Sequence, residues 1–366
     1  MKRSASLILV SALWGVSGCG DGRTVVTVRS GSSIQAAVAA ATDNMIIEVE
    51  PGTYRESIDI PANRQLKNFT LRGKFVGDQR VILDGSDQAT GQIQLQNGIF
   101  ASDVTNFTVE GFQVQNYREN GIWIGATALG KSRDLTFRNN IVDRTGKYGI
   151  FPQAAVNALV EKNKVTRVAD AGIYVGQSEG NLIIQDNEVA QNVAGIECEN
   201  SNDCVIRRNN SHDNTGGILV FTLPGLLRKE CLRAQVYENT IENNNTPNFA
   251  SQSDIVYNVP SGSGVTIIGA DQVTVRNNTI RGNQSYAAAV VSLTLLTGGD
   301  PIDVNPDPEN DAIRNNTLSG NGTADFTFRG TPIQASDFLY DGSGTGNCQA
   351  GNGTVTQALN PLPSCP

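Results

Sequence analysis

Glu197 and Glu199 are the residues of this sequence best placed to do chemistry, because only one residue separates them in the stretch 195–199. If that stretch is a β-strand, alternate residues point to the same face and the two carboxyl groups lie about 7 Å apart. A pair at this spacing can serve as an acid and a base, or can bind a calcium ion. We expect Lys147 and Asp170 to complete this candidate catalytic group.

The reaction class of this group stays open. Glycoside hydrolysis uses an acid–base pair of carboxyl groups, whereas lyase chemistry uses a base and a cation that stabilises an enolate. Arg144, Asp213 and the single histidine, His212, are further candidates. The alternative is that all of these side chains are solvated turn charges, which an acidic, turn-rich chain carries in number.

Glycine followed by isoleucine recurs along the chain and predicts a series of short strands. The isoleucines of this pattern are Ile122, Ile150, Ile173, Ile196 and Ile218. If they point inward, the residues that follow them point outward. That outward column consists of Trp123, Phe151, Tyr174, Glu197 and Leu219. Two positions further along, Glu199 and Phe221 fall in a second outward column.

Aromatic rings stacked from strand to strand suit binding to the flat faces of sugar rings. Trp123, Phe151, Tyr174 and Phe221 are therefore the candidate substrate-binding residues. The alternative is a hydrophobic face covered by a loop such as 245–260, since exposed apolar patches of this size are otherwise rare on soluble proteins.

A second repeated pattern predicts the architecture that positions these residues. An apolar residue, two polar residues, Asn, a variable residue and another apolar residue recur, and successive Asn residues from Asn140 to Asn316 lie 23, 24, 22, 30, 39 and 38 apart, which gives a period near 23 in the first coils. The best copies are 137–142, 160–165, 184–189, 236–241, 275–280 and 313–318. Short strands at this period, separated by Asn and Gly, are typical of a parallel β-helix, an all-β solenoid. The Asn residues are expected to adopt the left-handed turn conformation and to hydrogen-bond from coil to coil.

The start of the repeat region resembles a known family. Ser33 begins an amphipathic helical stretch, and the segments 51–56 and 81–85 follow. Together they resemble the opening of pectin-lyase-like right-handed β-helix proteins, and the resemblance covers roughly 32–325. It implies a right-handed solenoid whose first coil is capped by a helix. Lyases, esterases, epimerases, hydrolases and non-catalytic proteins share this opening, so no single activity is implied.

A narrower resemblance concerns the segments 216–226, 245–249 and 259–265, which are similar to a group of exported bacterial β-helix proteins of unassigned role. It implies no catalytic residue. We expect a capping helix at 32–44, the β-helix at 45–325 and an irregular tail at 326–366.

The cysteines add two expected disulfides. A bond between Cys348 and Cys365 would close the Gly- and Pro-rich tail, stabilising it by roughly 3 kcal/mol. We also favour a bond between Cys204 and Cys231, which leaves Cys198 as a buried thiol.

The N-terminal sequence predicts an export signal. Residues 1–18 combine a basic start with an apolar run too short to span a bilayer, and 16–19 resemble the bacterial lipobox. We expect Cys19 to be lipidated, with 19–31 as a linker, and Gly20 after it indicates the outer membrane of the cell envelope. The alternative is an ordinary cleaved signal that happens to contain Cys19.

Composition narrows the function. The 366 residues carry a net charge of −8, which argues against nucleic-acid binding. The sequence has no phosphate loop and no serine-hydrolase elbow, so nucleotide cofactors are not expected. Calcium is the one metal that the paired carboxyl groups suggest. We expect a lipid-anchored envelope protein that binds a polysaccharide and cleaves it, by lyase-type chemistry or hydrolysis, or epimerises it. The alternative is a non-catalytic scaffold that binds another exported protein.

The lipid anchor leads to a direct prediction. Cys19→Ser removes the only thiol that could be lipidated there, so this variant should accumulate as a soluble protein, whereas the wild type should enter the detergent phase on phase separation. Detergent partitioning that survives the substitution would contradict the anchor.

Overall fold

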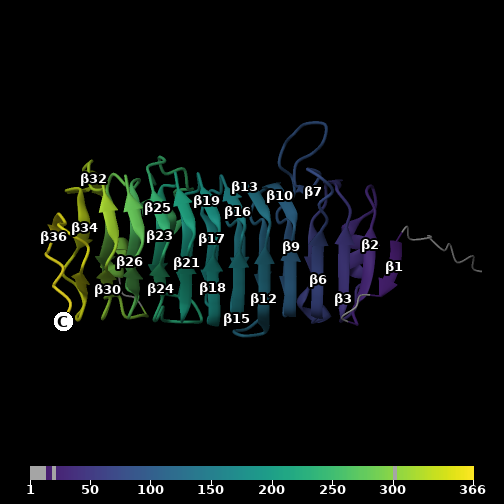
Figure 1. Ribbon diagram of the computed structural model, residues 1–366, viewed down its shortest axis with the longest axis horizontal. Coiled ribbons are helices and arrows are strands. Elements are labelled where there is room, and N and C mark those ends of the chain that lie inside the picture. Colours follow the sequence, from purple (N-terminus) through teal and green to yellow (C-terminus); the bar gives the residue numbers. More distant parts are fainter. Residues whose placement is uncertain (1–13, 19–21, 300–302) are drawn as a thin grey trace, which may run out of the picture.

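Residues 14–18, 22–299 and 303–366 are described by a computed structural model, and they form an elongated solenoid of stacked coils (Figure 1). Within these residues, strands from successive coils line up in three long sheets, which we call sheets A, B and C. A typical coil contributes one strand to each sheet in turn. The expected all-β parallel β-helix is thereby confirmed.

Sheet A contains β1 (Trp14–Gly18), β2 (Thr24–Val28), β3 (Met45–Val49), β6 (Lys67–Gly73), β9 (Thr105–Glu110), β12 (Ser132–Arg138), β15 (Ala155–Glu161), β18 (Glu179–Gln185), β21 (Cys204–Arg207), β24 (Gln235–Tyr237), β27 (Thr274–Arg276), β30 (Ala312–Arg314) and β35 (Cys348–Ala350). Its strands are paired in parallel except for β1, which runs antiparallel to β2.

Sheet B contains β4 (Gly52–Tyr54), β7 (Val81–Asp84), β10 (Phe112–Tyr117), β13 (Ile141–Thr145), β16 (Lys164–Thr166), β19 (Glu188–Ala190), β22 (Asn210–His212), β25 (Thr240–Glu242), β28 (Thr279–Arg281) and β31 (Thr317–Ser319).

Sheet C contains β5 (Ile58–Ile60), β8 (Ile99–Ser102), β11 (Ile122–Gly125), β14 (Ile150–Pro152), β17 (Ala171–Gly176), β20 (Ala194–Glu199), β23 (Gly216–Phe221), β26 (Ser263–Ile268), β29 (Tyr286–Val291), β34 (Ser336–Tyr340) and β36 (Gln357–Leu359). The remaining elements are α1 (Ile34–Ala39), η1 (Ala62–Arg64), η2 (Ile255–Asn258), α2 (Leu293–Thr297) and the hairpin of β32 (Phe326–Phe328) and β33 (Thr331–Ile333).

The core is the apolar interior of the solenoid, filled by the inward-pointing residues of all three sheets. Ile122, Ile150, Ile173, Ile196 and Ile218 are fully buried, as expected from the Gly–Ile pattern. Near the N-terminal end the interior is filled by aromatic residues, and the rings of Phe69 and Phe107 stack with centroids 5.5 Å apart. Because alternate residues point inward, the residues between them form the outer surface of each sheet.

A ladder of buried Asn side chains joins consecutive coils at the turn from sheet A to sheet B. The Asn187 side chain donates to Asn209 Oδ1 and to the carbonyl of Val160, both at 2.9 Å. Its own Oδ1 accepts from the backbone and side-chain amides of Asn163 at 3.0 Å. The same contacts recur along Asn140, Asn163, Asn187, Asn209, Asn239, Asn278, Asn316 and Asn352.

The left-handed conformation belongs to the residue before each ladder Asn, which corrects our expectation for these turns. Asp186 has φ 57° and Arg208 has φ 53°, whereas Asn187 and Asn209 are outside the left-handed region. The ladder Asn is therefore specified by its hydrogen bonds and not by backbone conformation. A second buried ladder, at the turn from sheet B to sheet C, runs through Asn192, Asn214, Asn244, Asn283 and Asn321.

The solenoid is longer at both ends than the expected limits of 45 and 325. Strand β2 lies in the segment that we expected to be a linker, and it pairs in parallel with β3. Strands β34, β35 and β36 extend sheets C and A into the expected irregular tail. These late coils were missed because the tail keeps the ladder residue Asn352 but has Gln349 where the Asn pattern has an apolar residue. The capping helix α1 lies within its expected range, and Ser33 caps it by accepting from the Ala36 amide.

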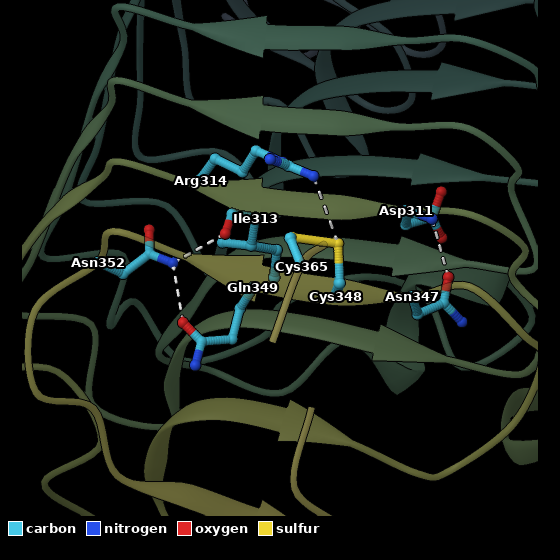
Figure 2. Close-up of a disulfide and its surroundings, with 8 residues drawn as sticks. All are labelled: Asp311, Ile313, Arg314, Asn347, Cys348, Gln349, Asn352 and Cys365. Carbon is cyan, nitrogen blue, oxygen red and sulfur yellow. Dashed lines mark hydrogen bonds between the residues drawn. A yellow bond between two sulfur atoms is a disulfide. The ribbon is translucent and has the colours of Figure 1, made fainter. Parts of the chain in front are cut away.

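The cysteines differ in part from expectation. Cys348 and Cys365 form the expected disulfide, which holds the last residues against β35 (Figure 2). The expected Cys204–Cys231 disulfide is wrong, because Cys198, Cys204 and Cys231 are all free thiols in the core. The sulfur atoms of Cys198 and Cys231 lie 4.0 Å apart. Cys19 lies outside the described residues. No helix in the described part of the chain is long and apolar enough to cross a membrane.

The Asn ladder makes a prediction about stability. Asn187→Leu leaves buried amide and carbonyl partners on three neighbouring strands and turns unpaired, at about 1–3 kcal/mol for each group. We expect a loss of at least about 3 kcal/mol in the free energy of unfolding, measured by urea denaturation. Asn210→Leu makes the same change at an exposed position on the next coil, directly after the ladder residue Asn209, and should cost little. Equal losses in the two variants would show that the ladder does not hold the coils together.

Candidate functional site

The outward column of sheet C has the expected register. Trp123 pairs with Phe151 on the next coil, Tyr174 pairs with Glu197, and Glu197 pairs with Leu219. Glu199 pairs with Phe221 in the neighbouring column. The structure adds one aromatic residue at the N-terminal end, Phe100, which pairs with Trp123.

The aromatic rings of this column form a continuous row. Phe100 and Trp123 have centroids 4.6 Å apart, Trp123 and Phe151 stack at 5.8 Å, and Phe151 lies 4.6 Å from Tyr174. Tyr148, from the connection before β14, stacks on Tyr174 at 4.3 Å. The row therefore leads from one coil to the next towards Glu197.

Exposure falls along the row. Phe100 and Trp123 are partly exposed, whereas Phe151 and Tyr174 are only 6% exposed and Glu197 1%. Phe221 is also buried. From Phe151 onward the column is therefore a covered hydrophobic face, which was the alternative to an open sugar-binding face. Only its N-terminal end is available to a ligand without a change in conformation.

The cover is the connection 245–262 between β25 and β26, which we call the covering segment. Val256 and Ala250 in this segment form a small apolar cluster with Val193. Asn248 holds the segment in shape, because its side-chain amide donates to the carbonyls of Val256 and Val259 at 2.8 and 2.9 Å. Val259 and Pro260 also line an apolar cavity of about 50 Å³ together with Leu219, Phe221 and residues of α2 and β33.

Three buried carboxyl groups lie along sheet C, one directly before β17 and beside Asp254 of the covering segment, and two on β20. Asp170, Glu197 and Glu199 are each at most 5% exposed. Asp170 Oδ1 and Glu197 Oε1 are buried without a hydrogen-bond partner. A buried carboxylate without a partner is strongly destabilised, so these groups are expected to hold a proton.

The pKa values of this group are shifted accordingly. Burial raises the pKa of Asp170 to about 8, with Asp254 adding to the shift and Lys147 opposing it. Burial also raises the pKa of Glu199 to about 7, although the hydrogen bond from Tyr174 lowers it in part. The pKa of Glu197 is raised by burial and then by the charges of Asp170 and Glu199.

Tyr148 and Asp254, which we did not predict from the sequence, also belong to this group. The hydroxyl of the predicted residue Tyr174 donates to Glu199 Oε2 at 2.6 Å. The ring of Tyr148 stacks on Tyr174 and brings a second phenol beside the carboxyl groups. Burial and the charges of Asp170 and Glu197 raise the Tyr148 pKa. Asp254, from the covering segment, lies 3.6 Å from Lys147 Nζ. Tyr148 precedes a Gly–Ile pair and could have been noticed, whereas nothing in the repeat pattern points to Asp254.

The other charged candidates lie elsewhere. Arg144 hydrogen-bonds to Asn116 and pairs with Asp143, both on sheet B. His212 lies on β22 and its Nδ1 is 2.8 Å from Asp213. Among the described residues, no group of three or more His, Cys, Asp or Glu is arranged to hold a metal ion. Calcium therefore stays a prediction from the sequence.

The raised pKa values predict how stability depends on pH. The folded state keeps a proton on Asp170 that the unfolded state releases, so the free energy of unfolding should fall as pH rises from about 4 to about 8. By linkage, Asp170 alone should account for a fall of roughly 3–4 kcal/mol between pH 5 and pH 8 in urea denaturation.

Asp170→Asn cannot ionise, so it should remove much of this fall and raise stability at pH 8. Asp78→Asn, at an exposed site, is the control and should leave the fall unchanged. A fall that is the same in wild type and Asp170→Asn would contradict a protonated Asp170.

Several solved structures have similar folds. The A-module of mannuronan C-5 epimerase AlgE6 from Azotobacter vinelandii has a TM-score of 0.63 and 16% identity, over 93% of this chain and 87% of that one. The AlgE4 A-module from the same organism has a TM-score of 0.58 and 14% identity, with the same coverage. DFA-IIIase from Arthrobacter chlorophenolicus A6, solved without its lid in complex with GF2, has a TM-score of 0.51 and 12% identity, over 85% of each chain.

At these identities the structural similarity concerns the fold alone, and no curated protein matches the sequence. The family described as Right handed beta helix region matches residues 81–225 and 128–296, and these overlapping matches together span more than half of the chain. The chain therefore belongs to the right-handed β-helix family, as its repeats and its opening segments had indicated.

Proposed function

We propose that this protein is a glycan-modifying enzyme of the bacterial cell envelope, with its reactive groups along sheet C beside the covering segment. The observation that carries the proposal is the aromatic row that leads from partly exposed Phe100 and Trp123 to the buried carboxyl groups. A row of rings offers stacking surface to successive sugar units. The carboxyl groups stand at the end of that row, where a glycosidic bond or a sugar carbon would need a proton donor.

The pKa shifts support acid–base chemistry. An effective general acid has a pKa near the working pH, and the pKa values of about 7 for Glu199 and about 8 for Asp170 meet that condition. Glu197 and Glu199 are two residues apart on one strand, so their side chains start about 7 Å apart, which leaves room for a water between the carboxyl groups. Hydrolysis, which uses two carboxyl groups at such a spacing, is thus favoured.

Elimination or epimerisation needs a base and a cation. Lys147 is the cation next to this group, and it is engaged by Asp254 of the covering segment. A substrate that displaces the covering segment would free Lys147 at the same moment as it reaches Asp170. The product of the reaction distinguishes these possibilities.

The site requires the covering segment to act as a lid. Apart from the hydrogen bonds at its two ends, its contacts are an ion pair of 3.6 Å with a partly exposed Lys147, a small apolar cluster around Val256 and the packing of Val259 against the residues that line the cavity. Partly exposed ion pairs of this kind contribute about 0–1 kcal/mol, so displacement by a bound glycan is energetically accessible.

The lipobox-like segment 16–19 supports attachment to the envelope through Cys19, with the outer membrane as the proposed location. Cleavage before Cys19 would remove β1, and β2 would then be the first strand of sheet A. The rest of the solenoid would keep its parallel pairing.

A second candidate function is a non-catalytic scaffold that binds another exported protein. It is favoured by the burial of Phe151, Tyr174 and Phe221, and by three exposed apolar side chains on the covering segment. These are Phe249, Ile255 and Tyr257. In that case the carboxyl groups would be a structural feature beneath a docking surface.

Two substitutions test the enzymatic proposal. Trp123→Ala removes a stacking surface and should weaken glycan binding about 10-fold, while Phe75→Ala, an exposed ring on another face, should not. Glu199→Gln keeps the shape of the side chain and should lower the turnover rate at least about 100-fold. The assay follows reducing ends, new ultraviolet absorbance and sugar configuration across a panel of polysaccharides.

The outcome separates the two functions. Reducing ends without absorbance identify hydrolysis, absorbance identifies a lyase, and a changed configuration without cleavage identifies an epimerase. If the wild type gives none of these signals and binds no glycan, the enzymatic proposal falls and the scaffold remains.

A further inference from the structure

A column of charged residues runs along the outer face of sheet A, close to the turn into sheet B. Each member pairs in register with the next, one coil further along the solenoid. In chain order the column consists of Glu48, Arg72, Glu110, Arg138, Glu161, Gln185, Arg207, Tyr237, Arg276 and Arg314. The side chains of such a column stack about 4.8 Å apart, so the column forms a line along the solenoid axis.

The N-terminal half of this column alternates in charge and neutralises itself. Arg72 lies between Glu48, at 3.1 Å, and Glu110, at 2.5 Å. Arg138 pairs with the other oxygen of Glu110 at 2.5 Å. Opposite charges on neighbouring strands stabilise a sheet, so the charged side chains in this half need no further partner.

The alternation stops at the middle of the column. Gln185 stands where the pattern calls for a cation, Arg207 is followed by Tyr237 and not by a carboxylate, and Arg276 is followed directly by Arg314. Within the described residues, no ion pair joins Arg207, Arg276 or Arg314 to a carboxylate. Like charges on neighbouring strands are destabilising, and all three side chains are partly exposed. We call Arg207, Tyr237, Arg276 and Arg314 the arginine stripe.

Neutral groups hold the guanidinium groups of the stripe in place. Arg276 lies over the ring of Tyr237, 4.2 Å from its centroid. Arg207 donates to the Tyr237 hydroxyl at 3.1 Å and to Gln185 Oε1 at 2.8 Å. Arg314 points along the sheet towards the Cys348 sulfur, 3.8 Å away (Figure 2). The cations are therefore ordered in advance, although nothing in the stripe neutralises them.

We infer that the arginine stripe binds a linear acidic polysaccharide, whose carboxylate groups take the places that Glu48, Glu110 and Glu161 hold in the other half of the column. Arginine binds carboxylates through paired, planar hydrogen bonds, which an ordered guanidinium makes at low entropic cost. The stripe is a line of single cations along the axis, which matches a single chain with regularly spaced charges.

A polynucleotide fits the stripe less well. It needs a broad basic surface, and this chain has a net charge of −8. The stripe also lies on sheet A, whereas the aromatic row and the carboxyl groups lie on sheet C. The inference thus goes beyond the proposed function and does not depend on it, since the stripe could hold the protein on an acidic polymer whatever happens on sheet C.

Binding of polygalacturonate at low salt, measured by isothermal titration calorimetry, tests the inference. The double variant Arg276→Gln/Arg314→Gln should bind about 10-fold more weakly than the wild type. Lys131→Gln/Arg133→Gln changes the net charge equally at exposed positions near β12, and should bind like the wild type. Neutral dextran should not bind to the stripe, and polygalacturonate binding should weaken as salt is added.

A second variant restores the alternation. Tyr237→Glu places a carboxylate between Arg207 and Arg276, so it should abolish polygalacturonate binding without lowering the melting temperature. Because this variant gains internal ion pairs, its loss of binding cannot be ascribed to unfolding if the melting temperature is retained.

Three results would overturn the inference. They are no binding of polygalacturonate by the wild type at low salt, equal affinity of Arg276→Gln/Arg314→Gln and the wild type, and tighter binding of single-stranded DNA than of polygalacturonate. The last result would make the stripe a polynucleotide site. Loss of activity in Glu199→Gln with unchanged polygalacturonate binding would support two separate faces.

Discussion

The whole structure depends on one constraint, that every coil stacks on the next in the same register. The buried Asn ladder enforces it, because each ladder side chain bonds to the coils on both sides and tolerates no shift. Once the register is fixed, a side chain at a given position meets its counterpart on the neighbouring coil. The aromatic row of sheet C and the charged column of sheet A both follow from this rule.

Regular stacking also shows which outward positions stabilise the fold and which destabilise it. Alternating charges in the first half of the sheet A column suit the fold, as do the isoleucines inside it. Buried carboxyl groups beside two tyrosines, and consecutive arginines on adjacent strands, do not. Both departures occur on outward positions, which the solenoid can vary without disturbing its interior. Such local conflicts with the fold are where function is expected.

Much of the fold and of the sheet C column could be predicted from the sequence. A regular period fixes which residues pair between coils and which point inward or outward. The inward isoleucines, the column from Trp123 to Leu219 and the pairing of Glu199 with Phe221 all follow from counting. The cover of that column was expected only as one of two alternatives, a loop such as 245–260, since this connection interrupts the period and its path depends on tertiary contacts. The cysteine pairing failed for a related reason. Cys198 and Cys231 approach each other through a long connection whose course no repeat dictates.

The central claim is that carboxyl groups beside the covering segment are held protonated near neutral pH. The most direct measurement is a carbon-13 NMR titration of side-chain carboxyl groups, with Asp170→Asn and Glu199→Gln used for assignment. We predict signals that titrate at pH values of about 8 for Asp170 and about 7 for Glu199, each lost in its own variant. If both groups instead titrate near their ordinary values of about 4, the carboxyl groups are solvated and the site as described here does not exist.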